Sequence, residues 1–63
     1  MTFGEKLQKL RKAQGLSQEE LAGRLSVTRQ TISKWELDQS TPELALLAQI
    51  SDIFGITTAY RIK

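Results

Sequence analysis

The 63-residue sequence contains no cysteine and no histidine. Disulfides, thiolate chemistry and the usual zinc frameworks are therefore excluded, and no metal or cofactor is expected. Long apolar runs are also missing, because the longest, at residues 44–48, is far shorter than the roughly 20 residues that span a bilayer. The first residues lack a signal-peptide pattern. These absences predict a cytoplasmic protein with no membrane partner and no evident small-molecule site.

Histidine is also the commonest catalytic base, so its absence weighs against an enzyme. Glu19 and Glu20 are adjacent carboxylates, and Ser17 and Ser33 are possible nucleophiles, but no base is available to activate a hydroxyl group. The two carboxylates are explained instead as negative charges at the N-terminus of a helix. So small a domain also leaves little room for a cleft that excludes water. We therefore predict no catalytic activity.

Size and charge fit one small domain with a polyanionic partner. A chain of 63 residues with 40% hydrophobic content can build one modest core, so we expect a single domain over residues 1–63. The net charge is only +2, so the basic residues must be concentrated locally to matter for a polyanion. Seven of the nine basic residues precede position 35, namely Lys6, Lys9, Arg11, Lys12, Arg24, Arg29 and Lys34. Four of the seven acidic residues follow it, namely Glu36, Asp38, Glu43 and Asp52.

Capping residues predict where the first helices begin. Capping boxes start at Thr2 and Ser17, each with a glutamate three residues later, and Thr28 offers a third side-chain cap. Gly15 supplies a stop for the first helix. Apolar residues at helical spacing follow each cap. The predicted helices are 3–14, 18–25 and 29–37.

The connection between the second and third of these helices is too short for an ordinary hairpin. Only residues 25–27 separate the two, so we expect a steep crossing, as in a helix-turn-helix, over residues 17–37. A steep crossing brings the backbones together and needs a small residue, for which Ala22 is suited, opposite the apolar Ile32 and Trp35. Base stacking is the alternative role for Trp35, but its position on the inward stripe favours the core.

The outward face of the third helix suits a DNA groove. Arginine can bind guanine O6 and N7, glutamine can bind adenine N6 and N7, and serine and lysine can reach base edges or phosphates. The alternative is a solvated helix face, for which any polar residues would serve. The tight corner favours the DNA interpretation. The outward residues are Arg29, Gln30, Ser33 and Lys34.

These features together resemble the lambda-repressor-like, or Xre-type, helix-turn-helix family of bacterial and phage regulators. The stretches that carry the resemblance are Leu16-Ser-Gln-Glu-Glu-Leu-Ala22 and Val27-Thr-Arg-Gln-Thr-Ile-Ser-Lys-Trp-Glu36, and it extends over nearly the whole chain. The resemblance implies an all-α, compact five-helix bundle whose residues 29–37 form the recognition helix in the major groove. It further implies double-stranded DNA as the partner, a homodimer on inverted-repeat half-sites, and transcriptional regulation, usually repression.

The resemblance assigns roles to individual residues. Thr31 lies at the edge of the base-reading face, and Thr28 combines helix capping with a phosphate contact. The base-reading residues are then Arg29, Gln30, Thr31, Ser33 and Lys34. The phosphate-binding residues are Arg11, Lys12, Ser17, Gln18 and Thr28, and the structural residues are Ala22, Ile32, Trp35 and Glu36.

One pairing and two departures follow from the same resemblance. Arg11 and Glu36 are expected to form a salt bridge beneath the DNA-facing surface, the alternative being an Arg11 that is free in solvent. Ser26 stands where the family commonly has glycine, and a positive φ there would cost about 1 kcal/mol. Asp38 follows Leu37 where the family often has Asn-Gly, and its charge would repel a phosphate.

The last third of the chain leaves a second function open. Thr41-Pro42-Glu43 predicts the start of a fourth helix, with proline at its first position, and Gly55 predicts its end. The apolar residues between them cover more than one stripe, so this helix is either central to the bundle or meets a partner. A short fifth helix is expected within residues 56–63, where Ala59, Arg61 and Ile62 depart from the family pattern. The alternative is therefore a protein-interaction module or antitoxin-type headpiece that uses Leu46, Ile53 and the C-terminal surface.

Overall fold

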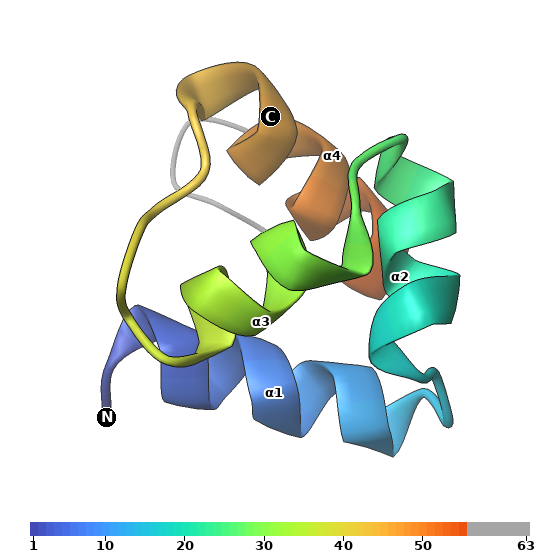
Figure 1. Ribbon diagram of the computed structural model, residues 1–63. Coiled ribbons are helices and arrows are strands. Elements are labelled where there is room, and N and C mark those ends of the chain that lie inside the picture. Colours follow the sequence, from blue (N-terminus) through green and yellow to red (C-terminus); the bar gives the residue numbers. More distant parts are fainter. Residues whose placement is uncertain (56–63) are drawn as a thin grey trace, which may run out of the picture.

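The computed structural model describes residues 1–55, and this part of the chain folds into helices alone (Figure 1). It contains four helices, α1 (Phe3–Ala13), α2 (Gln18–Leu25), α3 (Arg29–Glu36) and α4 (Leu44–Phe54). The all-α fold class with a helix-turn-helix is confirmed. Of the five helices expected, the fifth falls in residues 56–63, outside the described residues. None of the four helices is long and apolar enough to span a membrane.

The predicted caps of the first three helices are confirmed. Complete capping boxes begin α1 at Thr2 and α2 at Ser17. The Thr28 hydroxyl accepts from the Thr31 backbone N–H at the start of α3. Gly15 follows the end of α1 and has φ +71°, a left-handed conformation that glycine adopts at little cost. These three starts were predictable because each cap depends only on residues within one turn.

The start of α4 was predicted two residues too early. Glu43, with φ −71° and ψ 168°, is extended and forms the N-cap, so the helix begins at Leu44 and its first hydrogen bond runs from the Leu47 N–H to the Glu43 carbonyl oxygen. The Glu43 side chain makes no capping hydrogen bond. Pro42 is buried and lies before the helix rather than in its first turn. The predicted end at Gly55, with φ +66°, is confirmed.

The corner between α2 and α3 contains a left-handed residue, at the serine that stands where the family commonly has glycine. Ser26 has φ +60° and ψ 39°, and the N–H of Val27 beyond it donates to the Ala22 carbonyl oxygen at 3.0 Å. This bond satisfies one of the carbonyl groups left open at the end of α2. The chain therefore changes direction sharply within a few residues, and α3 runs across α2 at a steep angle (Figure 1).

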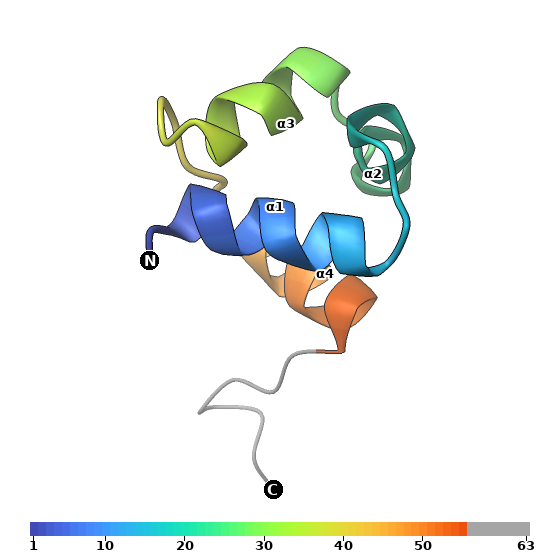
Figure 2. The same ribbon diagram turned by 90° about the horizontal axis from the view of Figure 1, so that it is seen from below.

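The helices surround one small core. Figure 2 shows α3 on one side of α1 and α4 on the other side. Helix α2 lies across the C-terminal end of α1. All four helices contribute buried side chains, so the core depends on every helix. The buried apolar residues are Leu7, Leu21, Ala22, Leu25, Ile32, Trp35, Ile50 and Phe54.

Gly4 allows α1 to approach the end of α3 closely, which the sequence pattern did not reveal. A Cβ atom placed on Gly4 would lie 2.6 Å from the Trp35 carbonyl oxygen and closer still to that of Glu36. Because both of these neighbours belong to the backbone, neither can move without shifting α3. Gly4 is therefore required for the spacing of α1 and α3.

We predict opposite effects for two glycine-to-alanine substitutions. Gly4→Ala should lower the free energy of unfolding by about 1 to 3 kcal/mol, because the added methyl group overpacks the contact with α3. Gly23→Ala is the matched control, since Gly23 lies in α2 with nothing within 4 Å of an added Cβ. It should raise stability by roughly 0.5 to 1 kcal/mol. The free energy of unfolding of both variants can be measured in urea, with circular dichroism as the probe. A Gly4→Ala variant as stable as Gly23→Ala would contradict the close approach of α1 and α3.

We predict that Glu20 makes stability depend on pH on the acid side. The Ser17 backbone N–H, followed by the Ser17 side chain, lowers the pKa of Glu20 below its ordinary value of 4.5. A carboxyl whose pKa is lower in the folded state stabilises it above the unfolded-state pKa, and this contribution is lost as pH falls through the folded-state pKa. Glu20→Gln should therefore lower the free energy of unfolding at neutral pH. The difference in this free energy between the variant and wild type should become smaller as the pH falls below 4.5. Unfolding experiments across that range test this, and a constant difference would contradict it.

Candidate functional site

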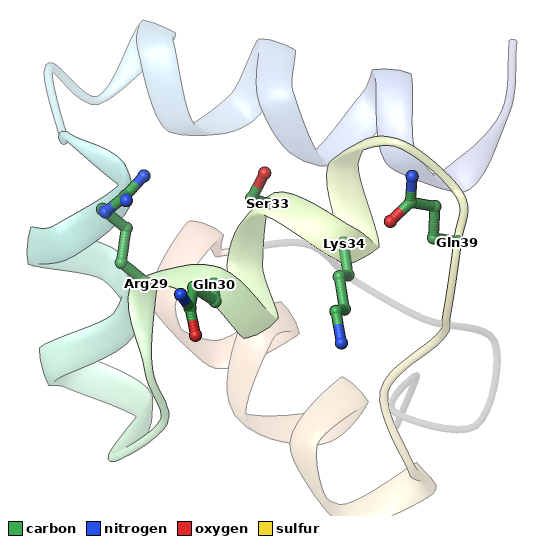
Figure 3. Close-up of a pocket in the computed structure, with 5 residues that line it drawn as sticks. All are labelled: Arg29, Gln30, Ser33, Lys34 and Gln39. Atoms are coloured by element: carbon green, nitrogen blue, oxygen red, sulfur yellow. The ribbon is translucent and has the colours of Figure 1, made fainter.

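One face of α3 presents a row of polar side chains. Arg29, Gln30 and Lys34 are exposed and Ser33 is half-buried. Together with Gln39 these residues line an open depression of about 420 Å³ (Figure 3). Within residues 1–55, no hydrogen bond or ion pair holds any of these five side chains. Their donors and acceptors are therefore available to a ligand.

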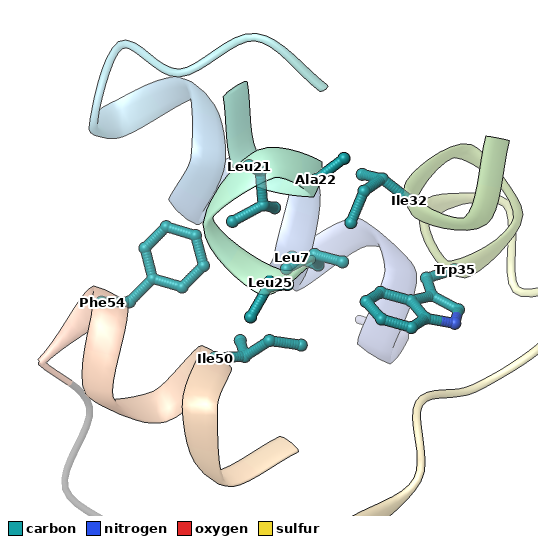
Figure 4. Packing of buried hydrophobic residues seen from close by; sticks show 8 residues of the cluster. All are labelled: Leu7, Leu21, Ala22, Leu25, Ile32, Trp35, Ile50 and Phe54. Atoms are coloured by element: carbon teal, nitrogen blue, oxygen red, sulfur yellow. The ribbon is translucent and has the colours of Figure 1, made fainter. Parts of the chain in front are cut away.

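The opposite face of α3 is anchored in the core, as predicted. Ile32 is fully buried and Trp35 is 3% exposed. In Figure 4 the Trp35 ring lies beside the other core side chains, and Ala22 of α2 lies next to Ile32. The structural roles predicted for Ala22, Ile32 and Trp35 are consistent with this packing, and Trp35 is not placed to stack on bases. Burying one face of α3 fixes the orientation of the other.

The two threonines at the start of α3 bind each other. The hydroxyl oxygens of Thr28 and Thr31 lie 2.9 Å apart, and the Thr28 oxygen also accepts from the Thr31 backbone N–H. Thr31 is half-buried and does not line the depression. It therefore stands at the edge of the polar face rather than within it.

Glu36 lies at the centre of a buried polar cluster that joins three helices. Its carboxylate accepts from Arg11 Nε at 2.6 Å and Nη2 at 3.2 Å, and from Gln18 Nε2 at 3.0 Å. Arg11 Nη1 donates in addition to the Leu16 carbonyl oxygen at 2.8 Å. The predicted salt bridge is confirmed, with the side chains of Arg11 and Glu36 only 9% and 3% exposed. The alternative of an Arg11 free in solvent is wrong.

This cluster changes what two predicted phosphate contacts can do. Arg11 is buried and donates one N–H from each of its three nitrogen atoms to protein oxygens, so its phosphate contact stays a prediction that depends on the two N–H groups left on Nη1 and Nη2. The Gln18 side-chain nitrogen carries two N–H groups and uses one on Glu36, so the other remains available to a phosphate oxygen. Gln18 is half-buried and is held in place by Glu36.

Lys12 and Ser17, also predicted to contact phosphate, are both exposed. Lys12 lies in the last turn of α1, and no ion pair holds its side chain within the part of the chain that the structure describes. The Ser17 hydroxyl accepts from the Glu20 N–H at 3.0 Å, which leaves its own O–H group as a donor. The structure thus places Lys12, Ser17 and Gln18 near the junction of α1 and α2.

Gln39 extends the polar face beyond α3 and Asp38 directly precedes it; neither was among the predicted site residues. Asp38 Oδ1 accepts from the Gly4 N–H at 3.0 Å, so this carboxylate is used within the protein and is not simply a free charge. Gln39 lines the depression with the α3 residues. The one sequence signal for this was the departure from Asn-Gly after Trp35-Glu36.

No group of three or more potential metal ligands occurs among residues 1–55. The polar face of α3 contains no carboxylate, and it is an open depression rather than an enclosed cavity. Its hydrogen-bond donors, acceptors and cations lie on an open surface, which suits a large ligand that carries both donor and acceptor groups.

Comparison with known proteins gives a family match. The helix-turn-helix family matches residues 7–61, which is most of the chain. No solved structure gives a significant match. The match includes α2, α3 and the turn between them, where the polar face lies.

Several regulators have similar sequences. A prophage-derived HTH-type transcriptional regulator of Bacillus subtilis, YonR, is 39% identical over 61 residues, which cover 97% of this chain and 56% of the relative. The HTH-type transcriptional activator BcrR of Enterococcus faecalis is 47% identical over 57 residues, covering 90% of this chain and 28% of the relative. ImmR of Bacillus subtilis, also an HTH-type transcriptional regulator, is 28% identical over 60 residues, covering 95% of this chain and 47% of the relative. The chain thus spans about half, or less, of the length of these relatives.

We predict that Glu36→Gln strongly destabilises the protein. The substitution removes the charge that compensates the buried Arg11, and breaking a buried ion pair in this way costs about 3 to 5 kcal/mol. The measurement is the free energy of unfolding in urea. Glu43→Gln is the matched control, because Glu43 is exposed and makes no capping hydrogen bond, and it should change stability by no more than about 0.5 kcal/mol. Equal stability of the two variants would contradict the role assigned to Glu36.

Proposed function

Because the chain belongs to the lambda-repressor-like (Xre-type) helix-turn-helix family of transcription regulators, we propose that residues 1–63 form one DNA-binding domain that inserts α3 into the major groove of duplex DNA. The observation that carries this proposal is the free polar face of α3, which lies opposite Ile32 and Trp35 in the core. The family is one of regulators that normally lack enzymatic activity.

Base reading falls to the residues along the polar face. Arg29 is suited to the O6 and N7 atoms of guanine, and Gln30 to the N6 and N7 atoms of adenine. Ser33 and Lys34 follow one turn later and reach base edges or adjacent phosphates. Thr31, whose hydroxyl is paired with that of Thr28, contributes at the edge through its methyl group, which suits the methyl group of a thymine.

Phosphate contacts come from the N-terminal end of α2 and its surroundings. Gln18 offers its remaining N–H, Lys12 its ammonium group and Ser17 its hydroxyl group, while Thr28 lies at the start of α3. The backbone N–H groups at the start of α2 add partial positive charge, which attracts a phosphate. The negative charges of the nearby Glu19 and Glu20 reduce this attraction. These contacts position the domain and carry no sequence information by themselves.

The proposed assembly is a homodimer on inverted-repeat half-sites, because one short helix reads only a few base pairs and a lone domain binds weakly. Half-sites would lie about one helical turn of DNA apart. The proposed biological output is repression in the cytoplasm of a bacterial or phage-infected cell. An activating role would need a further contact with the transcription machinery.

A protein-interaction surface on α4 is the second candidate function. Leu44 is 74% exposed, and an apolar depression of about 200 Å³ lies between α1 and α4. However, Leu46 and Ile53, on which the sequence-based alternative depended, are half-buried and pack against the core. This reduces the free apolar surface of α4, and the polar face of α3 remains the stronger candidate.

Titration with a random-sequence DNA duplex at low and raised salt separates the two functions. A DNA-binding domain releases counterions when it binds, so its affinity should fall steeply as the salt concentration rises. An interaction module should show little binding at either concentration. Fluorescence anisotropy of a labelled duplex makes the measurement, and an affinity independent of salt would overturn the proposal.

We predict that substitutions in the two sets of contacts have different consequences for sequence preference. Arg29→Ala and Gln30→Ala should each relax the preference at one base pair, by about 1 to 3 kcal/mol, because each removes a bidentate base contact. Gln18→Ala should weaken binding to all sequences nearly alike, since it removes a phosphate contact. Selection from a random-duplex pool, followed by affinity measurements on single-base variants of the selected site, distinguishes these outcomes.

Gln49→Ala is the control for these glutamine substitutions. Gln49 is exposed on α4, which Figure 2 shows on the side of α1 away from α3, so this variant should bind as wild type does. A loss that depended on sequence for Gln18→Ala would overturn its proposed anchoring role. A uniform loss for Arg29→Ala would overturn base reading by that residue.

A further inference from the structure

Gln39 lies outside α3 and yet belongs to its polar face. It lines the depression together with the four α3 side chains, and Figure 3 shows it beyond the end of α3 that is farther from Arg29. Its backbone N–H donates to the Lys34 carbonyl oxygen at 2.8 Å, which fixes the main chain. Its carboxamide is exposed and has no hydrogen-bond partner within residues 1–55. Gln39 thus combines a fixed backbone with an unused recognition group.

Asp38 determines where Gln39 lies. Asp38 has φ +61°, a left-handed conformation that aspartate and asparagine adopt more readily than most residues. Its Oδ1 atom accepts from the Gly4 N–H at 3.0 Å, which ties the turn after α3 to the start of α1. The main chain therefore turns immediately after α3 and brings Gln39 back beside Lys34.

The chemistry of Gln39 favours a base edge over a phosphate. A carboxamide presents an N–H donor and a carbonyl acceptor side by side, which match the N7 and N6 atoms of adenine in the major groove. A phosphate oxygen can use only the donor, and the neighbouring Asp38 carboxylate would repel it. Serving a base, Gln39 would use both of its hydrogen-bonding groups.

The separation of Gln39 from Arg29 gives it a different base pair to read. The 8 residues of α3 span roughly 12 Å, and base pairs stack about 3.4 Å apart, so the two ends of the helix address base pairs about three steps apart. We propose that Gln39 is a specificity-determining residue that reads an adenine–thymine pair at the end of the half-site opposite that read by Arg29, and that Asp38 is its positioning residue. This rests on the proposed DNA-binding function.

Selection from a random-duplex pool with the full chain tests the role of Gln39. Gln39→Ala should lose the preference at one adenine–thymine pair and leave the preferences set by Arg29 and Gln30 unchanged. Its affinity for the wild-type site should fall about 5- to 150-fold, the equivalent of one bidentate contact. A duplex substituted at that pair should be bound almost equally by Gln39→Ala and by wild type. Gln49→Ala, the exposed glutamine on α4, should select the wild-type site.

Two substitutions at Asp38 test the positioning. Asp38→Ala removes the acceptor for the Gly4 N–H and should lose the preference at the same pair as Gln39→Ala. Asp38→Asn keeps an acceptor and a side chain that tolerates the left-handed conformation, so it should retain that preference while its lost charge strengthens binding to all sequences. A purely structural role for Asp38 would lower stability without changing the preference at this one pair, and that result would overturn the positioning role.

The remaining outcomes separate this inference from the function on which it rests. If wild type shows no salt-dependent duplex binding, both fail. If Arg29→Ala loses the preference at the base pair that Arg29 reads while Gln39→Ala still selects the wild-type site, only the inference about Gln39 fails. An equal loss of affinity for all sequences by Gln39→Ala would show a phosphate contact and overturn base reading.

Discussion

The buried carboxylate of Glu36 is where α1, α2 and α3 meet. It accepts from Arg11 and Gln18, and Arg11 also holds the Leu16 carbonyl oxygen in the turn between α1 and α2. A charge removed from water is tolerated only when its partners are all in place, so this cluster favours one relative placement of the helices over alternatives that apolar contacts alone would permit. The relative positions of three helices in a 63-residue chain are thereby fixed.

The same cluster connects the two kinds of contact in the proposed complex. Glu36 lies at the C-terminal end of α3, whose other face carries the polar row, and it also holds Gln18 at the start of α2. The residue proposed to fix a phosphate is therefore attached to the helix proposed to read bases. Because phosphate contacts position a domain on the duplex, the link between Glu36 and Gln18 holds the proposed phosphate contact and α3 in one relative position.

Features that depend on neighbouring residues were predictable from the sequence, whereas those that depend on tertiary distances were not. The capping boxes at Thr2 and Ser17 and the burial of Trp35 follow from spacing along a helix. The Arg11–Glu36 pair came from family resemblance, and its depth of burial was not foreseen. Gly4 and Asp38 are 34 positions apart, so nothing local indicated their contact or the resulting position of Gln39. The early start predicted for α4 has a local cause, because the pattern around Pro42 is equally compatible with an extended residue before the helix.

Weak overall charge gives these positioned contacts particular importance. A net charge of +2 supplies little long-range attraction to DNA, and Glu19, Glu20 and Asp38 lie close to the proposed interface. Affinity for the proposed target must therefore come from a few well-placed hydrogen bonds and cations rather than from a general basic field. Such contacts lose their value if the side chains move relative to one another. Two carboxylates near the C-terminal end of α3 limit that motion, because Glu36 holds Gln18 and Asp38 ties down the turn that precedes Gln39. Acidic residues thus reduce the general attraction to DNA and also hold the side chains of the proposed specific contacts in place.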